Sequence, residues 1–410
     1  MQQTKKENIQ WQINEKKKPY SSKVLHDFTN SEIKRVYQFQ KTHPLYNETP
    51  LVRLSNLAAE LGVEEIFVKN EACRFGLNAF KVLGGIYAVG KFLAERIGRD
   101  IESLSFEELK SPKIRELTGE LTFISATDGN HGRGVAWAAR ELGHKSVIYM
   151  PKGSSTRRLE AIKAEGAHAE ITHYNYDDAV RLASSHAKVN GWIVIQDTSW
   201  EGYEDIPLWI MQGYATISKE IVEQMEVISE EPPTHVFLQA GVGSFASSVA
   251  AFLIQHYRER YPKIIVVEPH QANCFYLSFK NKGESFQTVS GDMDTIMAGL
   301  ACGEPNPRAW DILSHFSEAS FSCDDSISAL GMRILGNPIG KDQRIISGES
   351  GSVTTGLIYC LTKNKALFEV KEKLKINEKS RILLINTEGD TDEAHYRKTV
   401  WEGTYPLTNI

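Results

Sequence analysis

The chain has few cysteines and no long apolar run, and each shortage excludes a class of protein. Its 410 residues include 5 cysteines, an odd number with no Cys-x-x-Cys pair, so the sequence predicts neither a metal site nor a disulfide framework. Cys274 and Cys302 bracket a polar stretch and are the one pair worth considering for a disulfide, although reduced core thiols are the expected state. No apolar stretch reaches the roughly 18 residues that a membrane span requires, so we expect no membrane insertion.

The chain also lacks an excess of positive charge. The net charge is −5 with 24% charged residues, which gives no electrostatic reason to expect nucleic-acid binding. Residues 1–18 are polar and rich in lysine and glutamine, and they lack the apolar segment of a secretory signal. We therefore expect a cytoplasmic protein.

The sequence does contain short apolar runs that alternate with helix-like segments. Most of these runs are continuous, as in parallel strands buried on both faces, so the alternation predicts an α/β fold with parallel sheets. With 41% hydrophobic residues, a chain of this length can bury a large core and form two domains. We expect strands at residues 121–126, 146–150, 169–173, 192–196, 235–239, 264–268 and 381–386, helices at 85–96, 135–142, 156–165, 176–189 and 245–260, and a polar helical insertion at 106–117.

Two motifs together indicate an amine that faces an anion-binding loop. Lys81 follows Phe80 and precedes Gly84-Gly85, where a bulky ligand can approach the backbone. The run 125–134, Ser-Ala-Thr-Asp-Gly-Asn-His-Gly-Arg-Gly, joins an expected strand to an expected helix, whose start presents free N–H groups to an anion. Taken separately, the lysine would be interpreted as a surface residue and the run 125–134 as an ordinary turn between a strand and a helix.

A third motif, Gly241-Val242-Gly243-Ser244, follows the strand at 235–239 and predicts a phosphate cradle. The same segment also fits a dinucleotide fingerprint, with Glu268 placed 25 positions beyond Gly243. That alternative would make the protein an oxidoreductase. A hydride-transfer enzyme needs neither Lys81 nor the loop around Asn130, so we favour the phosphate cradle.

In this order, the Phe-Lys pair, the Gly-Asn-His-Gly loop and the later glycine loop resemble the pattern of pyridoxal-phosphate enzymes related to tryptophan synthase β and threonine dehydratase. Residues 126–134 are similar to the corresponding run of the diaminopropionate ammonia-lyases. The resemblance extends from about Tyr46 nearly to the C-terminus. It implies a type II fold in which a smaller domain, 89–207, is nested in a larger one, 1–88 plus 208–410, with the active site between them. It also implies a homodimer.

Pyridoxal phosphate requires from a protein an amine for an imine linkage, a phosphate cradle, a partner for the ring nitrogen and a site for the substrate carboxylate. The resemblance assigns these roles to particular residues. They are Lys81 for the amine, Gly241, Val242, Gly243 and Ser244 for the phosphate, Thr387 for the ring nitrogen, Asn130 for the phenolic oxygen, and Thr127, Asp128 and Gly129 for the substrate.

Two carboxylates bear on specificity and catalysis. Many relatives have an uncharged residue at the position of Asp128, where a carboxylate would attract an added ammonium group and so favour 2,3-diaminopropionate. With Lys81 on one face of the cofactor and Asp128 on the other, both L and D substrates could react. The resemblance implies that Asp197, at the end of the strand 192–196, is a catalytic partner of Asp128, although a turn or helix cap explains it equally well from the sequence alone.

The prediction is therefore a lyase that eliminates ammonia from the small amino acid 2,3-diaminopropionate. A threonine or serine dehydratase is the alternative within the same class, and Asp128 argues against it. The turn Ser347–Ser352 is interpreted either as lining the site or as a helix cap. Glu388, Asp390 and Asp392 are interpreted as solvated surface charge rather than as a cation site.

Overall fold

Two sheets rich in parallel pairs organise the chain, which confirms the predicted α/β class. The computed structural model describes residues 7–18, 20–127, 129–228, 231–283 and 285–407. The larger sheet has the strand order β1 (Ile9–Ile13), β10 (Ser317–Cys323), β9 (Lys263–Pro269), β8 (His235–Gln239), β11 (Arg381–Asn386), β3 (Glu65–Asn70) and β2 (Leu51–Arg53). The smaller sheet has the order β6 (His168–Ile171), β5 (Lys145–Met150), β4 (Thr122–Ala126) and β7 (Ile193–Val194).

The strands of the smaller sheet are all parallel, and only the edge strands β1 and β2 run antiparallel to their neighbours in the larger sheet. The helices that cover the sheets are α1 (Asn30–Lys41), α2 (Ser55–Leu61), α3 (Val82–Arg96), α4 (Phe106–Leu109), α5 (Pro112–Thr118), α6 (Asn130–Glu141), α7 (Thr156–Ala164), α8 (Tyr176–Asn190), α9 (Asp205–Ile228), α10 (Ser244–Tyr257), α11 (Cys274–Lys280), α12 (Pro307–Phe316), α13 (Asp325–Gly336), α14 (Glu349–Lys363), α15 (Phe368–Leu374) and α16 (Glu393–Val400).

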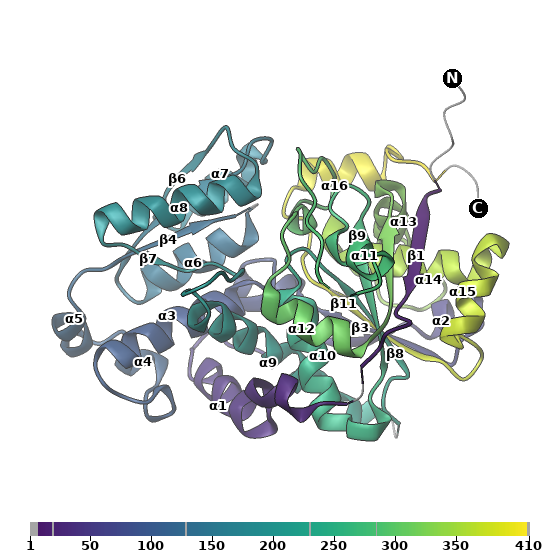
Figure 1. Ribbon diagram of the computed structural model, residues 1–410, viewed down its shortest axis with the longest axis horizontal. Coiled ribbons are helices and arrows are strands. Elements are labelled where there is room, and N and C mark those ends of the chain that lie inside the picture. The colour runs from purple at the N-terminus through teal and green to yellow at the C-terminus, as the bar shows by residue number, and fades with distance from the viewer. Residues whose placement is uncertain (1–6, 19, 128, 229–230, 284, 408–410) are drawn as a thin grey trace.

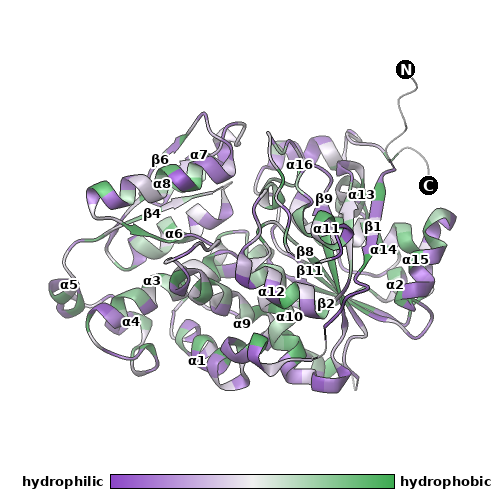
Figure 2. Cartoon of the chain, in the orientation of Figure 1, coloured by the Kyte–Doolittle hydropathy of each residue, from purple (hydrophilic) through white to green (hydrophobic). Residues whose placement is uncertain are grey.

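The central strands of the larger sheet are apolar on both faces because helices cover both. In β8, Val236 and Leu238 belong to one hydrophobic core, and Phe237 between them belongs to the other. Helix α10 lies in the first core and α14 in the second. Figure 2 shows apolar colour along these strands, whereas helices such as α1 and α8 carry both polar and apolar stretches. Each fully buried aliphatic or phenyl side chain stabilises the fold by about 1.5–3 kcal/mol.

The smaller sheet is inserted between two long helices. After β3 the chain forms α3, builds β4 to β7 and returns through α9, so that the two sheets stand apart in Figure 1. Helix α3 packs against both α6 and α9 and thereby links the two layers. The predicted domain boundaries at 88/89 and 207/208 fall inside α3 and α9, and the division into two domains remains a prediction.

The predicted elements all occur, with ends that shift by a few residues. Strands β8 and β11 have the predicted bounds, whereas the strand expected at 192–196 is reduced to Ile193–Val194. The expected insertion at 106–117 is two short helices, because Pro112 cannot continue a helix and instead begins a new one. All five cysteines are free thiols. Within the described part of the chain, no helix is both long and apolar enough to cross a membrane.

Candidate active site

A cavity lies at the carboxyl ends of strands from both sheets. The segments after β8 and β11 line it from the larger sheet. The start of α6 and the segment after β7 line it from the smaller one. Ligands of open α/β sheets bind at this edge. The cavity brings together Lys81, Asn130, Asp197, Gly241, Val242, Gly243, Ser244 and Thr387, all of them predicted site residues.

Lys81 directly precedes α3, and its amine faces a carboxylate. Its Nζ lies 3.3 Å from Oδ2 of Asp197, and its side chain is 14% exposed. The backbone before the lysine is tied to the end of β11, because the Phe80 N–H donates to the carbonyl oxygen of Thr387 at 3.1 Å. The strand end that carries Thr387 therefore also places the lysine.

Asp197 is a buried carboxylate that remains ionised. Its Oδ1 accepts a hydrogen bond from the Tyr176 hydroxyl at 3.0 Å. Burial by itself raises the pKa of this carboxyl, but the charges of Lys81 and His131 and the hydrogen bonds from Tyr176 and Lys81 outweigh burial and lower the pKa to about 2. At neutral pH Asp197 is thus the anionic partner of Lys81.

The glycine loop after β8 leads directly into α10. Gly243 has φ of +89°, and a Cβ at this position would lie 2.4 Å from the Phe275 ring, so only glycine fits. The first N–H groups of α10, which begins at Ser244, have no acceptor within the helix, and Ser244 and Phe245 line the cavity. The Ser244 hydroxyl donates to the carbonyl oxygen of Asp197 and accepts from the Asn306 amide at 2.9 Å. The loop is thus held as an anion cradle at a helix N-terminus.

Thr387 and Asn130 each keep a donor for a ligand. Thr387 Oγ1 accepts from the Gln239 amide at 3.1 Å, which leaves the hydroxyl proton able to point elsewhere. One amide hydrogen of Asn130 goes to the Glu388 carboxylate. An amide group has two such hydrogens, so the second can serve a ligand.

The loop before α6 is braced from within. Thr127 Oγ1 accepts from the N–H groups of Gly129 at 2.9 Å and Gly132 at 3.0 Å. Thr127 and Gly129 are not among the described residues that line the cavity, and Asp128 lies outside the described residues. The role of residues 127–129 in substrate binding therefore remains a prediction.

The alternative role for Glu268, as a ribose ligand, does not fit its surroundings. This side chain is fully buried, and it accepts hydrogen bonds from the N–H groups of Phe275 at 2.8 Å and Tyr276 at 2.7 Å at the start of α11. Burial raises its pKa to about 8 against these hydrogen bonds. Because Glu268 is used to fix a helix, the dinucleotide interpretation of the glycine loop loses its basis.

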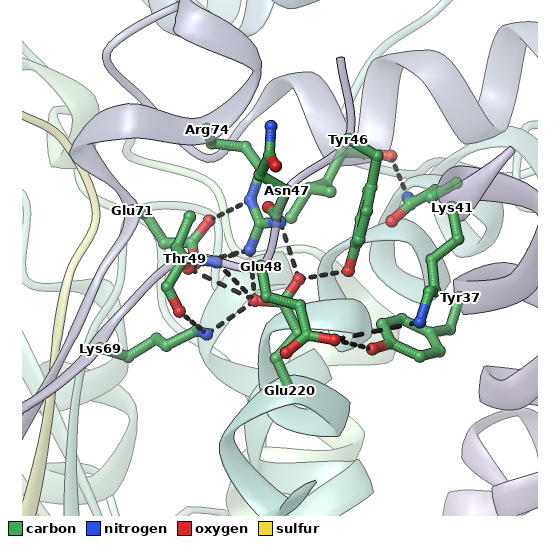
Figure 3. A network of polar contacts seen from close by, with 12 residues as sticks. Tyr37, Lys41, Tyr46, Asn47, Glu48, Thr49, Lys69, Glu71, Arg74 and Glu220 are labelled. Carbon is green, nitrogen blue, oxygen red and sulfur yellow. Dashed lines mark hydrogen bonds and ion pairs between the residues drawn. The ribbon is translucent and has the colours of Figure 1, made fainter. Parts of the chain in front are cut away.

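A buried ionic network anchors the segment between β3 and Lys81. Figure 3 shows Arg74 between Glu71 and Glu220, with its guanidinium 2.8 Å from Oε2 of Glu71 and 2.7 Å from Oε1 of Glu220. Lys69 lies 2.6 Å from the other oxygen of Glu220. All four side chains are fully buried, and two positive charges balance two negative ones, so none of these charges is left uncompensated.

A sequence profile described as "Pyridoxal-phosphate dependent enzyme" matches residues 43–388. The chain belongs to this family. Two relatives extend the likeness over nearly the full length. The diaminopropionate ammonia-lyase of Escherichia coli K12 is 52% identical over 380 residues, 93% of this chain and 94% of the relative. That of Salmonella typhimurium is 49% identical over 399 residues, 97% of this chain and 99% of the relative.

Solved structures of family members are similar to this chain in fold. The Escherichia coli diaminopropionate ammonia lyase in complex with D-serine has a TM-score of 0.90 at 48% identity and covers 97% of this chain and 98% of its own. Its complex with an aminoacrylate-PLP azomethine reaction intermediate has a TM-score of 0.89 at 48% identity, with 98% of each chain covered. A tomato threonine deaminase at 20% identity, with a TM-score of 0.71, shares the fold. The predicted type II fold is confirmed.

The residues around the cavity suit the cofactor of the family. Besides an amine and an anion cradle, the cavity wall contains buried polar atoms that a ligand can satisfy. Ser350 Oγ and Gln239 Oε1 have no hydrogen-bond partner among the described residues, and such buried atoms are normally paired in a protein that holds its ligand. Pyridoxal phosphate therefore fits the donors and acceptors that are present.

Two residues outside the family motifs also belong to this cavity. Glu388, interpreted from the sequence as solvated charge, is 2% exposed and lines the cavity, so that interpretation is wrong. It accepts from the N–H of Ser350 at 3.3 Å. Ser350 also lines the cavity, which confirms the first of the two interpretations of its turn. The one signal for Glu388 was its position directly after Thr387 at a strand end.

Proposed function

We propose that the protein is a pyridoxal-phosphate-dependent lyase that eliminates ammonia from 2,3-diaminopropionate. The observation that carries this proposal is the 49–52% identity, over almost the whole chain, to proteins named diaminopropionate ammonia-lyase. In the reaction the α-proton leaves Cα and the bond from Cβ to its nitrogen breaks. The 2-aminoacrylate that results takes up water and releases pyruvate and a second ammonia.

The cavity residues would hold the cofactor in the way that the motifs imply. Lys81 would carry it, the loop 241–244 and the start of α10 would hold its phosphate, Thr387 would face the ring nitrogen, and Asn130 would donate to the phenolic oxygen. When bound, pyridoxal phosphate supplies an electron-accepting ring that makes the α-proton of an amino acid removable. The support is that these side chains share one cavity and that Thr387 and Asn130 keep a donor available.

Asp197 is proposed as the acid that keeps the leaving nitrogen protonated until its bond to Cβ breaks. Amide ion is too poor a leaving group to depart unprotonated, so a group that can hold a proton must lie near Cβ. Lys81 is the largest contribution that lowers the Asp197 pKa, and burial alone raises it. When the Lys81 charge is absent, the pKa of this buried carboxyl therefore moves upward, towards the range of a proton donor.

Asp128 is proposed to select the substrate and to complete the second face of the site. A carboxylate attracts the β-ammonium group of diaminopropionate, which serine and threonine lack. Lys81 would take the α-proton of one enantiomer and Asp128 that of the other. The proposal rests on the position of Asp128 in the sequence, two residues before Asn130.

Pyruvate release from L- and D-diaminopropionate, serine and threonine tests this function. We expect turnover of both diaminopropionate enantiomers, with kcat/KM about 10²-fold or more above the values for serine and threonine. Higher values on serine or threonine would identify a dehydratase instead. In the same assay Asp128→Asn should lower turnover of one enantiomer by about 10²-fold and of the other far less. Equal losses for both would contradict the assignment of Asp128 to one face.

We further propose a cytoplasmic homodimer. The dimer is supported by the resemblance to the family, and a reducing compartment is supported by the five free thiols. Light scattering should give twice the chain mass of 46.1 kDa, and a mass of one chain would contradict the dimer. Recovery of the protein outside the cytoplasm on cell fractionation would contradict the location.

A further inference from the structure

A buried ion pair joins the layer of the smaller sheet to that of the larger sheet. Arg158 lies on α7, which packs against β6 and α6, and Glu349 is the first residue of α14, which packs against β8 and β11. Nη2 of Arg158 lies 3.4 Å from Oε2 of Glu349 and 3.2 Å from Oγ1 of Thr391. The two charged side chains are 9% and 4% exposed. This pair is thus a desolvated contact between the two layers.

The stem of Arg158 lies against the loop before α6. A Cβ built on Gly129 would lie 2.9 Å from Cδ of Arg158, 3.3 Å from its Cβ and 3.4 Å from its Cγ. Gly129 has φ of +151°, a conformation that favours glycine. The arginine stem therefore packs directly against Gly129, the residue that precedes Asn130.

Glu349 is held as an anion from its other side. His395 Nδ1 hydrogen-bonds to Oε1 of Glu349. Burial opposes the charge of Glu349, but the hydrogen bond from His395 and the charge of Arg158 outweigh burial and lower its pKa. The carboxylate that receives Arg158 is therefore charged at neutral pH and fixed in direction.

The contacts of Arg158 and Glu349 belong to a closed ring of contacts that includes residues of the active-site cavity. Ser350, the residue after Glu349, donates its N–H to Glu388, and Glu388 accepts from the side chain of Asn130. Asn130 adjoins Gly129, on which the arginine stem rests. The loop before α6 therefore contacts α7 through Arg158, and it is linked to α14 through Glu388.

We propose that Arg158 is a positioning residue, whose buried pair with Glu349 fixes Gly129 of the loop before α6, next to the cavity residue Asn130, and so sets the affinity for the substrate carboxylate. This inference rests on the proposed function, because the carboxylate site is assigned to that loop. Arg158 is not among the described residues that line the active-site cavity, and it lines a second cavity together with Glu349 and His395. It would act through the backbone of Gly129 without touching the substrate.

The chain offers a matched control on the same helix. Arg157, the neighbour of Arg158 on α7, pairs with Glu393 of α16 at 2.8 Å, and both of these side chains are about half exposed, at 51% and 50%. Arg157→Gln therefore removes an ion pair between the same layers without leaving a buried charge. Exposed pairs of this kind contribute little.

Kinetics on the holoenzyme separate positioning from a general structural role. For Arg158→Met, which keeps an apolar stem but no charge, we expect KM for diaminopropionate to rise about 10-fold or more and kcat to change by less than about 3-fold. Glu349→Gln should shift KM in the same direction, and Arg158→Lys, which restores the charge, should recover part of the loss. Arg157→Gln should match the wild type. An unchanged KM in Arg158→Met would overturn the proposal.

Hydrogen exchange of the holoenzyme without substrate gives a readout that does not depend on the reaction. Backbone amides in the peptide 121–135 should exchange about 10-fold faster in Arg158→Met than in the wild type and in Arg157→Gln, while strands of the larger sheet stay protected. Equal exchange in this peptide, or faster exchange throughout both sheets, would overturn the positioning role. If the wild type released no pyruvate from diaminopropionate, the proposed function would fail, and exchange would still decide whether Arg158 supports the loop.

Discussion

At the scale of single residues, Lys81 keeps the buried Asp197 carboxyl ionised. The carboxyl has its pKa lowered to about 2, although burial alone raises it. In cofactor-free protein, Lys81→Met should therefore raise the Asp197 pKa by about one unit or more, because the largest opposing charge is gone and burial remains. Carbon-13 NMR of the Asp197 carboxyl, titrated between pH 3 and 7, measures this shift.

Lys91→Met is the control for that titration, since this lysine lies on α3, which begins directly after Lys81, and its amine is placed over the Trp209 ring. It should leave the Asp197 signal unchanged. Because the wild-type pKa is lowered, the stability gained from this ion pair is present above about pH 4 and is lost as the pH falls towards 2. An Asp197 carboxyl that stays fully ionised at pH 3 in Lys81→Met would contradict the assigned cause of the shift.

At the scale of elements, the network around Arg74 fixes the segment that joins β3 to the lysine. Arg74→Met would leave Glu71 and Glu220 facing each other in a buried site with only Lys69 to compensate them. Breaking a buried pair in this way costs about 3–5 kcal/mol of unfolding free energy. Urea unfolding at pH 6 should show a loss of this size.

Arg35→Met serves as the matched control for Arg74→Met. Arg35 also pairs with two carboxylates, Glu32 and Glu102, but its side chain is 45% exposed, so the loss should stay below about 1 kcal/mol. Burial opposes the charge of Glu220, yet Arg74 and Lys69 lower its pKa. The stability that the ionised Glu220 contributes is thus lost on acidification. The difference in unfolding free energy between the wild type and Arg74→Met should therefore become smaller from pH 6 to pH 3.5. Equal losses for the two variants at pH 6 would contradict the role of burial.

The sequence predicted those strands and helices whose pattern of apolar residues can be recognised within the segment itself. Strands β8 and β11 could be located because helices cover both faces and their residues are continuously apolar. Strand β10, Ser317–Cys323, lacks the continuous apolar run of the predicted strands, because Ser320 and Ser322 alternate with apolar residues. Strand β3 ends in Lys69 and Asn70, and the lysine is buried only because Glu220, far along the chain, pairs with it.

At the scale of the whole molecule, the site exists because loops from two sheets meet. The motifs around Lys81, Asn130 and Gly241 could be predicted because each follows a strand or begins a helix. Glu388 and Arg158 could not, since their partners lie far away in sequence and only the packing of the two layers brings them together. Sequence motifs therefore identify the residues that we propose to hold the cofactor, and the fold identifies those that place them.

The central claim is that one lysine in the whole chain carries the cofactor, and Lys81 is the only lysine among the described residues that line the cavity. The most direct measurement is borohydride reduction of the holoenzyme, which fixes the cofactor to the amine that holds it, followed by digestion and mass spectrometry. We expect the added mass on the peptide that contains Lys81 and on no other, and no label in Lys81→Met. Label on another lysine, or no label at all, would contradict the account.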